Sequence, residues 1–107
     1  MADAYMEKAM TLWWYNDPFL LIRDGLMLLG IYGRVEEPIY MFTKALKHHP
    51  TNADIPYHLA RIYLEQKNDY EKGVPLLERA VALDSSHAYA HYHLAAAYAH
   101  LGKKEAH

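Results

Sequence analysis

The sequence predicts an all-α protein: an α-solenoid of antiparallel helical hairpins with about six helices. Three observations support this prediction. Short motifs recur every 34 to 36 residues, apolar residues within each segment lie three and four positions apart, and short polar turns separate the segments. Such a repeat is a pair of antiparallel helices joined by a tight turn. Because one pair cannot bury both of its faces, neighbouring pairs must stack.

The recurrence is clearest at an offset of 35 residues. A leucine, an alanine and a tyrosine recur at the same spacing, and upstream of them a large apolar residue precedes a basic residue and an alanine. The matching motifs are Leu59-Ala60-x-x-Tyr63 with Leu94-Ala95-x-x-Tyr98, and Phe42-x-Lys44-Ala45 with Leu77-x-Arg79-Ala80. This agreement predicts tandem repeats along the chain.

The first three helices are expected over about 3–14, 18–32 and 36–48. Residues 6–10 resemble residues 42–46, which lie 36 positions later, so the first helix is expected to be an unpaired second helix of a hairpin. Asp17-Pro18 separates it from the next helix. The third helix ends at His48-His49, where positive charge is favourable at a helix C-terminus.

The last three helices are expected over about 54–66, 70–83 and 87–101. Pro56 is typical of a helix start after Asp54, and Asp69 is a candidate N-cap. Pro75 is tolerated only in the first turn of a helix, so the helix over 70–83 is expected to begin late or to kink. On the last helix, an apolar stripe that includes Leu94 and Ala97 is expected to pack on the preceding repeat.

Composition and charge exclude several classes of protein. The net charge of −2 comes from 11 basic and 13 acidic residues, so no basic excess is present to bind nucleic acid. Cysteine is absent, which excludes disulfides and thiolate metal sites. The longest apolar region, 18–32, is interrupted by Arg23-Asp24 and is too short to insert in a membrane. No targeting segment is evident, so the default expectation is a cytoplasmic protein.

The sequence carries no motif of an enzyme or of a cofactor site. Phosphate-binding loops, a nucleophile elbow, the HExxH motif and the EF-hand loop are all missing. Serine occurs only at Ser85 and Ser86, in a turn between repeats, where no base is held at a defined distance. We therefore predict that the protein is not an enzyme and that it needs no cofactor.

Histidine offers weak candidates for metal binding. His87 and His91 lie four residues apart and share one face of a continuous helix, a spacing that can bind zinc or nickel. Specific metal sites need three or four converging ligands, and two histidines do not supply them. No metal is therefore expected, and histidine-based metal binding remains an alternative.

The repeated motifs resemble the tetratricopeptide repeat (TPR), whose first helix pairs leucine, a small residue and tyrosine at this spacing. The resemblance covers almost the whole chain and implies a right-handed superhelix with a concave inner wall. It also implies that Tyr63 and Tyr98 occupy the packing site of the family. The single domain over 1–107 then divides into an unpaired helix at 3–17, repeats at 18–52 and 53–87, and a partial repeat at 88–107.

Three departures from the family pattern bear on packing and on partners. Pro38 and Gly73 stand where the family usually has alanine at the crossing of two helices, and the first repeat has Gly25-Leu26 where the others have leucine followed by alanine. The lysines and asparagines with which the family grips a C-terminal carboxylate are absent from the inner wall. A chaperone-tail partner is therefore not expected.

The resemblance places a set of polar and aromatic residues along the concave wall. They are Arg23, Met27, Asp54, Tyr57, His58, Arg61, Glu65, Tyr89, Tyr92, His93, Ala96 and His100. Rigid aromatic rings with an arginine are typical of peptide-binding surfaces. We predict a protein–protein interaction module, an adaptor or scaffold, that binds a peptide or helix of a partner in this groove. The alternatives are an assembly chaperone for a secretion or pilus subunit and a self-assembling scaffold.

The last predicted helix has a second face that a further helix would cover. That face carries His91, Ala95 and Tyr98. Terminal repeats usually end in a polar capping surface, and this face is rich in alanine instead. We expect either that the chain is a fragment or that the face binds another protein or a second copy of the chain.

Overall fold

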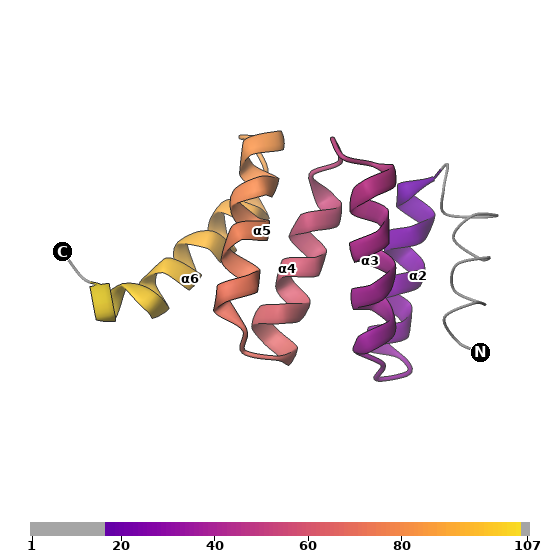
Figure 1. Ribbon diagram of the computed structural model, residues 1–107, viewed down its shortest axis with the longest axis horizontal. Coiled ribbons are helices and arrows are strands. Elements are labelled where there is room, and N and C mark those ends of the chain that lie inside the picture. The colour runs from indigo at the N-terminus through magenta and orange to yellow at the C-terminus, as the bar shows by residue number, and fades with distance from the viewer. Residues whose placement is uncertain (1–16, 106–107) are drawn as a thin grey trace.

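A computed structural model describes the backbone of residues 17–105 and the side chains of residues 17–102, and within this part of the chain all regular structure is helical (Figure 1). The helices are α2 (Pro18–Gly30), α3 (Glu36–His48), α4 (Asp54–Gln66), α5 (Tyr70–Leu83) and α6 (Ala88–Glu105). Their bounds agree with the predicted ranges within a few residues, and the all-α prediction is confirmed for these residues. The helix predicted over 3–14 lies outside the described residues.

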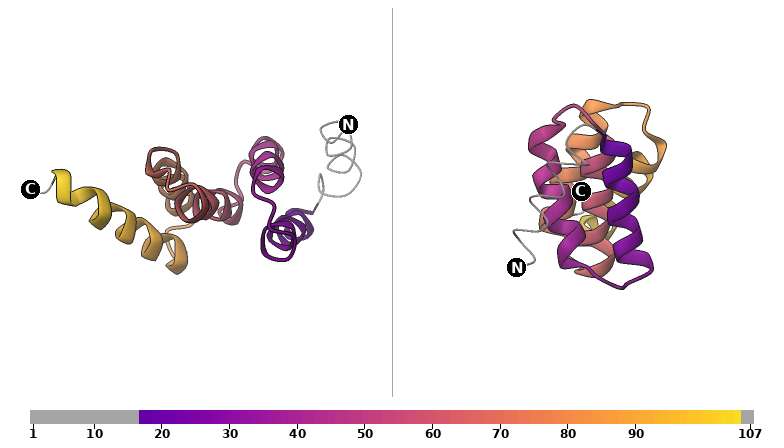
Figure 2. Two further views of the ribbon diagram at one scale, coloured as in Figure 1. Left: turned by 90° about the horizontal axis from the view of Figure 1, so that it is seen from below. Right: turned by 90° about the vertical axis from the view of Figure 1, so that its right-hand side faces the viewer.

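The helices follow one another in space in the order of the chain. Each one packs against the next, from α2 through α3, α4 and α5 to α6. Figure 1 shows α2 to α5 side by side, with α6 crossing away from α5 at the C-terminal end. Figure 2 shows the same order from below and from the end.

Side chains at the helix starts satisfy backbone N–H groups that no helical carbonyl can reach. The Asp17 carboxylate accepts from the N–H groups of Phe19 and Leu20, at 3.0 and 3.3 Å. The Asp69 carboxylate accepts from the Lys72 N–H at 3.1 Å, which confirms the predicted cap of α5. Asn52 caps α4 in the same way through the N–H groups of Asp54 and Ile55.

The turns within the two helical pairs are alike and lie 35 residues apart. In each turn one residue adopts a left-handed backbone conformation, Gly33 with φ 65° and Asn68 with φ 53°. The next residue then donates a hydrogen bond back to a carbonyl six residues earlier, which closes the turn. These bonds are Arg34 N–H to the Leu28 carbonyl (3.0 Å) and Asp69 N–H to the Tyr63 carbonyl (2.8 Å).

The junctions that follow each pair also match at an offset of 35. The His49 N–H donates to the Ala45 carbonyl at 2.8 Å, and the Asp84 N–H donates to the Ala80 carbonyl at 2.9 Å. The residue three positions after each of these donors closes a turn. The Asn52 N–H donates to the His49 carbonyl, and the His87 N–H donates to the Asp84 carbonyl. The sequence period is therefore matched by the backbone hydrogen bonds of both turn types.

The core consists of two clusters, and α4 contributes to both. The first joins α2, α3 and α4 and contains Leu21, Met41, Phe42, Ala45, Ile55, Leu59 and Ile62. The second joins α4, α5 and α6 and contains Tyr57, Ala60, Leu64, Leu77, Ala80, Ala90 and Ala97. Ala90 and Ala97 stand 35 residues after Ile55 and Ile62, so α6 packs through smaller side chains than α4 does. The predicted packing of Leu94 and Ala97 on the preceding repeat is confirmed.

Two glycines allow the paired helices to approach closely. A Cβ added at Gly25 on α2 would lie 2.5 Å from Cζ of the fully buried Phe42 on α3. A Cβ added at Gly73 on α5 would lie 2.7 Å from Cδ2 of Leu64 on α4. The residues that correspond to Gly25 and Phe42 at the offset of 35 are Ala60 and Leu77. At the α2–α3 crossing the side chain on one helix is therefore smaller, and the side chain on the other is larger, than at the α4–α5 crossing.

The expectation that the helix at 70–83 begins late because of Pro75 is wrong. α5 begins at Tyr70, and Pro75 lies inside it. The Pro75 ring lacks an N–H, so the carbonyl four residues earlier, that of Glu71, lies in a helix without the usual donor. Pro75 and Glu71 are both exposed, so water can take the place of that donor.

Candidate functional site

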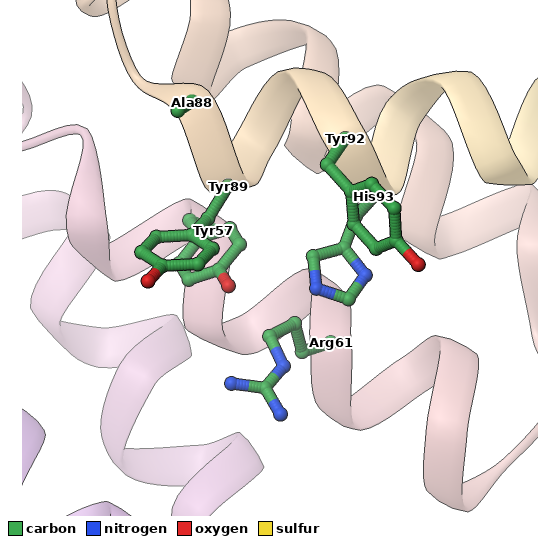
Figure 3. Close-up of a pocket in the computed structure, with 6 residues that line it drawn as sticks. All are labelled: Tyr57, Arg61, Ala88, Tyr89, Tyr92 and His93. Carbon is green, nitrogen blue, oxygen red and sulfur yellow. The ribbon is translucent and has the colours of Figure 1, made fainter.

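A pocket of about 530 Å³ lies between α4 and α6. Its lining is Tyr57, Arg61, Ala88, Tyr89, Tyr92 and His93 (Figure 3). All of these residues except Ala88 belong to the predicted groove. Ala88 was missed because its methyl group carries no chemical signal, although it lies one turn before Tyr92 on the same face of α6.

Helical spacing places these side chains on facing surfaces. Tyr57 and Arg61 lie four residues apart on α4, and Tyr89 lies three and four residues before Tyr92 and His93 on α6. Figure 3 shows the rings of α6 directed toward α4, with Arg61 below them. The two helices are separated by the whole of α5 in the sequence, so only the packing of the fold forms the pocket.

The Tyr57 ring forms the inner wall of the pocket. Its centroid lies 6.4 Å from that of Tyr89 and 5.7 Å from that of His93. Although Tyr57 was predicted along the open concave wall, its side chain is only 5% exposed and belongs to the second core cluster. The start of α6 covers it, with the His87 ring 4.8 Å away. Burial raises the pKa of its hydroxyl.

Arg61 is the one charged residue in the pocket lining. Its guanidinium lies 5.9 Å from the centroid of the Tyr57 ring, a cation–π arrangement. It also donates to the Glu65 carboxylate, from Nε at 3.3 Å and from a terminal nitrogen at 3.4 Å. The carboxylate offsets much of the positive charge, so the pocket presents aromatic surface with little net charge.

The outer rings of the pocket are exposed and uncharged. Tyr89 and Tyr92 are 69% and 68% exposed, and among the described residues neither hydroxyl has a hydrogen-bond partner. The Tyr92 and His93 rings meet edge to face with centroids 5.2 Å apart. Burial, and after it the charge of Arg61, lowers the pKa of His93 below its ordinary value of 6.5. His93 is therefore neutral at pH 7.

Several predicted groove residues lie outside the pocket. Arg23 and Met27 are on α2, and Arg23 pairs with Asp24 at 3.6 Å. Ala96 is exposed on α6 beyond the lining. The His100 ring stacks on Tyr70 of α5, with centroids 4.2 Å apart and planes 7° from parallel. The structure does not bring these residues to the pocket.

His58 is half-buried behind the pocket rather than exposed in it. Its ring lies 4.8 Å from that of Tyr57 and 6.4 Å from that of Phe42, and its buried Nδ1 has no hydrogen-bond partner. Burial, and after it the charge of Arg61, lowers the pKa of His58 to about 4. The side chain is therefore an uncharged packing element between the two core clusters.

The two histidines considered as metal ligands already bond to the protein. His87 Nε2 lies 2.8 Å from Asp54 Oδ1, and its Nδ1 accepts from the Ala90 N–H at 3.1 Å. His91 Nε2 lies 2.7 Å from the carbonyl oxygen of Ser85 and therefore donates to it. Among residues 17–102, whose side chains the structure describes, no group of three or more His, Asp or Glu side chains is placed to hold a metal ion.

The second face of α6 is exposed. His91, Ala95 and Tyr98 all lie on it, and Tyr98 is 47% exposed. The Tyr98 hydroxyl donates to the Glu78 carboxylate on α5, and this bond raises the pKa of Tyr98. The prediction that Tyr98 packs in the core like Tyr63 is therefore wrong, whereas Tyr63 does pack against the first core cluster.

No protein-family model matches the chain, and no curated protein resembles it significantly. In the part of the chain that the structure describes, no helix has both the length and the apolar character needed to cross a membrane.

Proposed function

We propose that the chain is a TPR-like protein-binding module that holds a segment of a partner protein in the pocket between α4 and α6. The observation that carries this proposal is the convergence of three tyrosines, Arg61 and His93 from two helices around one pocket. The pocket has a volume of about 530 Å³ and is open to solvent, so it suits one or two side chains of a bound segment.

The repeat assignment rests on two independent kinds of recurrence. Sequence motifs recur at 35 residues, and the hydrogen bonds of both turn types recur at the same offset. Stacked helical pairs form a scaffold whose exposed side chains stay at fixed spacings. A partner that binds such a surface bears most of the loss of conformational freedom, which favours recognition of short segments.

The experiment compares single exposed tyrosines inside and outside the pocket. The Tyr92→Ala variant loses an exposed ring of the pocket, and the Tyr32→Ala variant loses a ring that is 64% exposed beyond the end of α2. Proteins captured by the wild-type chain are expected to be lost with Tyr92→Ala and retained with Tyr32→Ala. If both variants capture the same proteins as the wild type, the pocket is not the binding site.

Self-assembly through α6 is a second candidate, favoured by the composition of that helix. Between Ala88 and Gly102 it has no Asp, Glu, Lys or Arg, and His91, Ala95 and Tyr98 are exposed. An uncharged face with small residues permits close contact with another helix. Sedimentation equilibrium tests this candidate, since Ala95→Glu is expected to abolish any concentration-dependent increase in mass. A monomeric wild-type chain would exclude it.

A further inference from the structure

The polar groups of the pocket indicate what kind of segment it accepts. Arg61 can only donate hydrogen bonds, whereas the hydroxyls of Tyr89 and Tyr92 and the ring of His93 can donate or accept. The remaining lining is aromatic rings and the methyl group of Ala88. A complementary segment therefore offers carbonyl groups as hydrogen-bond acceptors and apolar rings for packing. It does not need to carry many N–H donors of its own.

The charges of the pocket disfavour strongly charged segments. A lysine or a quaternary ammonium would meet Arg61, which already covers one face of the Tyr57 ring at 5.9 Å. An acidic side chain would meet the Glu65 carboxylate, which lies 3.3 Å from Nε of Arg61. Because each charge is matched within the protein, an uncharged segment is the best electrostatic complement.

We propose that the occupant is an uncharged, proline-rich segment of a partner protein in the polyproline II conformation. Such a segment exposes carbonyl groups, lacks N–H donors at each proline, and presents flat rings that pack on aromatic side chains. It is also ordered before it binds, so little conformational entropy is lost. This inference rests on the proposed function and deepens it by assigning the chemistry of the partner.

The spacing of the rings is consistent with this occupant. From Tyr57 to His93 the centroids are 5.7 Å apart, and from His93 to Tyr92 they are 5.2 Å apart. One turn of a polyproline II helix has three residues and rises roughly 9 Å. Each of these spacings is shorter than one turn, so one turn of such a helix can contact two neighbouring rings of the lining.

The test is isothermal titration of the full chain with a blocked decaproline peptide. The comparison peptides are a blocked glycine–serine peptide, a glutamate-rich peptide and a lysine-rich peptide of the same length. Decaproline is expected to bind and the glycine–serine peptide to give no heat. Tyr92→Ala and Tyr89→Ala are each expected to weaken decaproline binding at least tenfold, Tyr92→Phe by less, and Tyr32→Ala by less than twofold. Circular dichroism of each variant verifies that helicity is kept.

Three results would overturn the inference. Decaproline could fail to bind, it could bind equally well to the Tyr89 and Tyr92 variants, or a charged peptide could bind more tightly. If decaproline fails while Tyr92→Ala still loses captured proteins that Tyr32→Ala retains, the pocket binds a different class of segment and the proposed function stands. If the pocket variants change neither peptide binding nor capture, both proposals are wrong.

Discussion

His87 Nε2 lies 2.8 Å from Asp54 Oδ1 and so links the start of α6 to the first turn of α4. The other ring nitrogen accepts from the Ala90 N–H, which fixes the proton on Nε2 and makes His87 the N-cap of α6. The His87 ring also lies 4.8 Å from that of Tyr57. One side chain therefore caps a helix, joins two helices and closes the inner wall of the pocket.

Replacing this side chain tests its structural role. We expect His87→Ala to lower the free energy of unfolding by about 1–2 kcal/mol, since an N-cap and a second hydrogen bond are lost. Asp54→Asn keeps an acceptor at this exposed position and removes only the charge, so its effect is expected to stay below about 1 kcal/mol. Urea unfolding measures both. A His87→Ala variant as stable as the wild type would show that the link is not stabilising.

The lowered pKa of His58 predicts a pH dependence of stability. Its pKa is about 4 in the folded chain against an ordinary value of 6.5. Above pH 6.5 neither state binds the proton, so the full stability is present. Between pH 6.5 and 4 only the unfolded chain takes it up, so the free energy of unfolding falls as the pH falls, by about 3 kcal/mol at most.

The control for this prediction is a variant that cannot titrate at this position. We expect His58→Leu to show a flatter pH dependence of the urea midpoint between pH 6.5 and 4 than the wild type. An NMR titration of His58 reports its pKa directly. A midpoint near 6.5 in the folded chain would contradict the prediction.

The two glycines of α2 predict opposite effects of the same substitution. At Gly25 a methyl group would overlap the Phe42 ring, so Gly25→Ala is expected to destabilise the fold by about 1–3 kcal/mol. At Gly30 no atom lies within 4 Å of an added Cβ, so Gly30→Ala is expected to be neutral or to stabilise the helix by up to about 1 kcal/mol. Thermal unfolding of the two variants measures the difference. Equal changes would mean that the α2–α3 crossing is not tightly packed.

Alanines on α6 provide a matched pair for the second core cluster. Ala97 is 2% exposed, and Ala99 is exposed two residues later. Ala97→Leu is expected to cost about 1–3 kcal/mol, because α6 must move away from α5 to accommodate the larger side chain. Ala99→Leu is expected to change stability by less than about 0.5 kcal/mol. If Ala97→Leu is tolerated equally well, α6 is not packed as described.

The helices could be predicted because their signals are local. Apolar spacing and the Asp69 cap are present in short stretches of sequence, and the helix bounds follow from them. The 35-residue recurrence repeats the same local patterns further along the chain. The effect of Pro75 was misjudged because the carbonyl that loses its N–H donor, that of Glu71, is exposed and can bond to water. A proline whose unpaired carbonyl is buried destabilises a helix more. The left-handed Asn68 also carried a signal, since asparagine is one of the few residues that adopt this conformation readily.

The pocket could be predicted only in part, because it depends on how α6 crosses α4. Tyr89, Tyr92 and His93 share one face of a helix, which the sequence shows directly. The burial of Tyr57 and the contacts of His87 with α4 depend on residues about 30 positions apart. The half-buried position of His58 also depends on how the helices pack. The sequence around His58 could not predict it, since histidine occurs both on surfaces and in half-buried sites.

Because α4 contributes to both core clusters, the local stabilities of the two ends of the molecule are coupled. Ile55, Leu59 and Ile62 pack toward α2 and α3, whereas Tyr57, Ala60 and Leu64 pack toward α5 and α6. Local opening of α4 therefore removes partners from both sides at once. A segment that occupies the pocket and holds α4 closed is expected to slow amide hydrogen exchange in α2 and α3, well beyond the residues it touches.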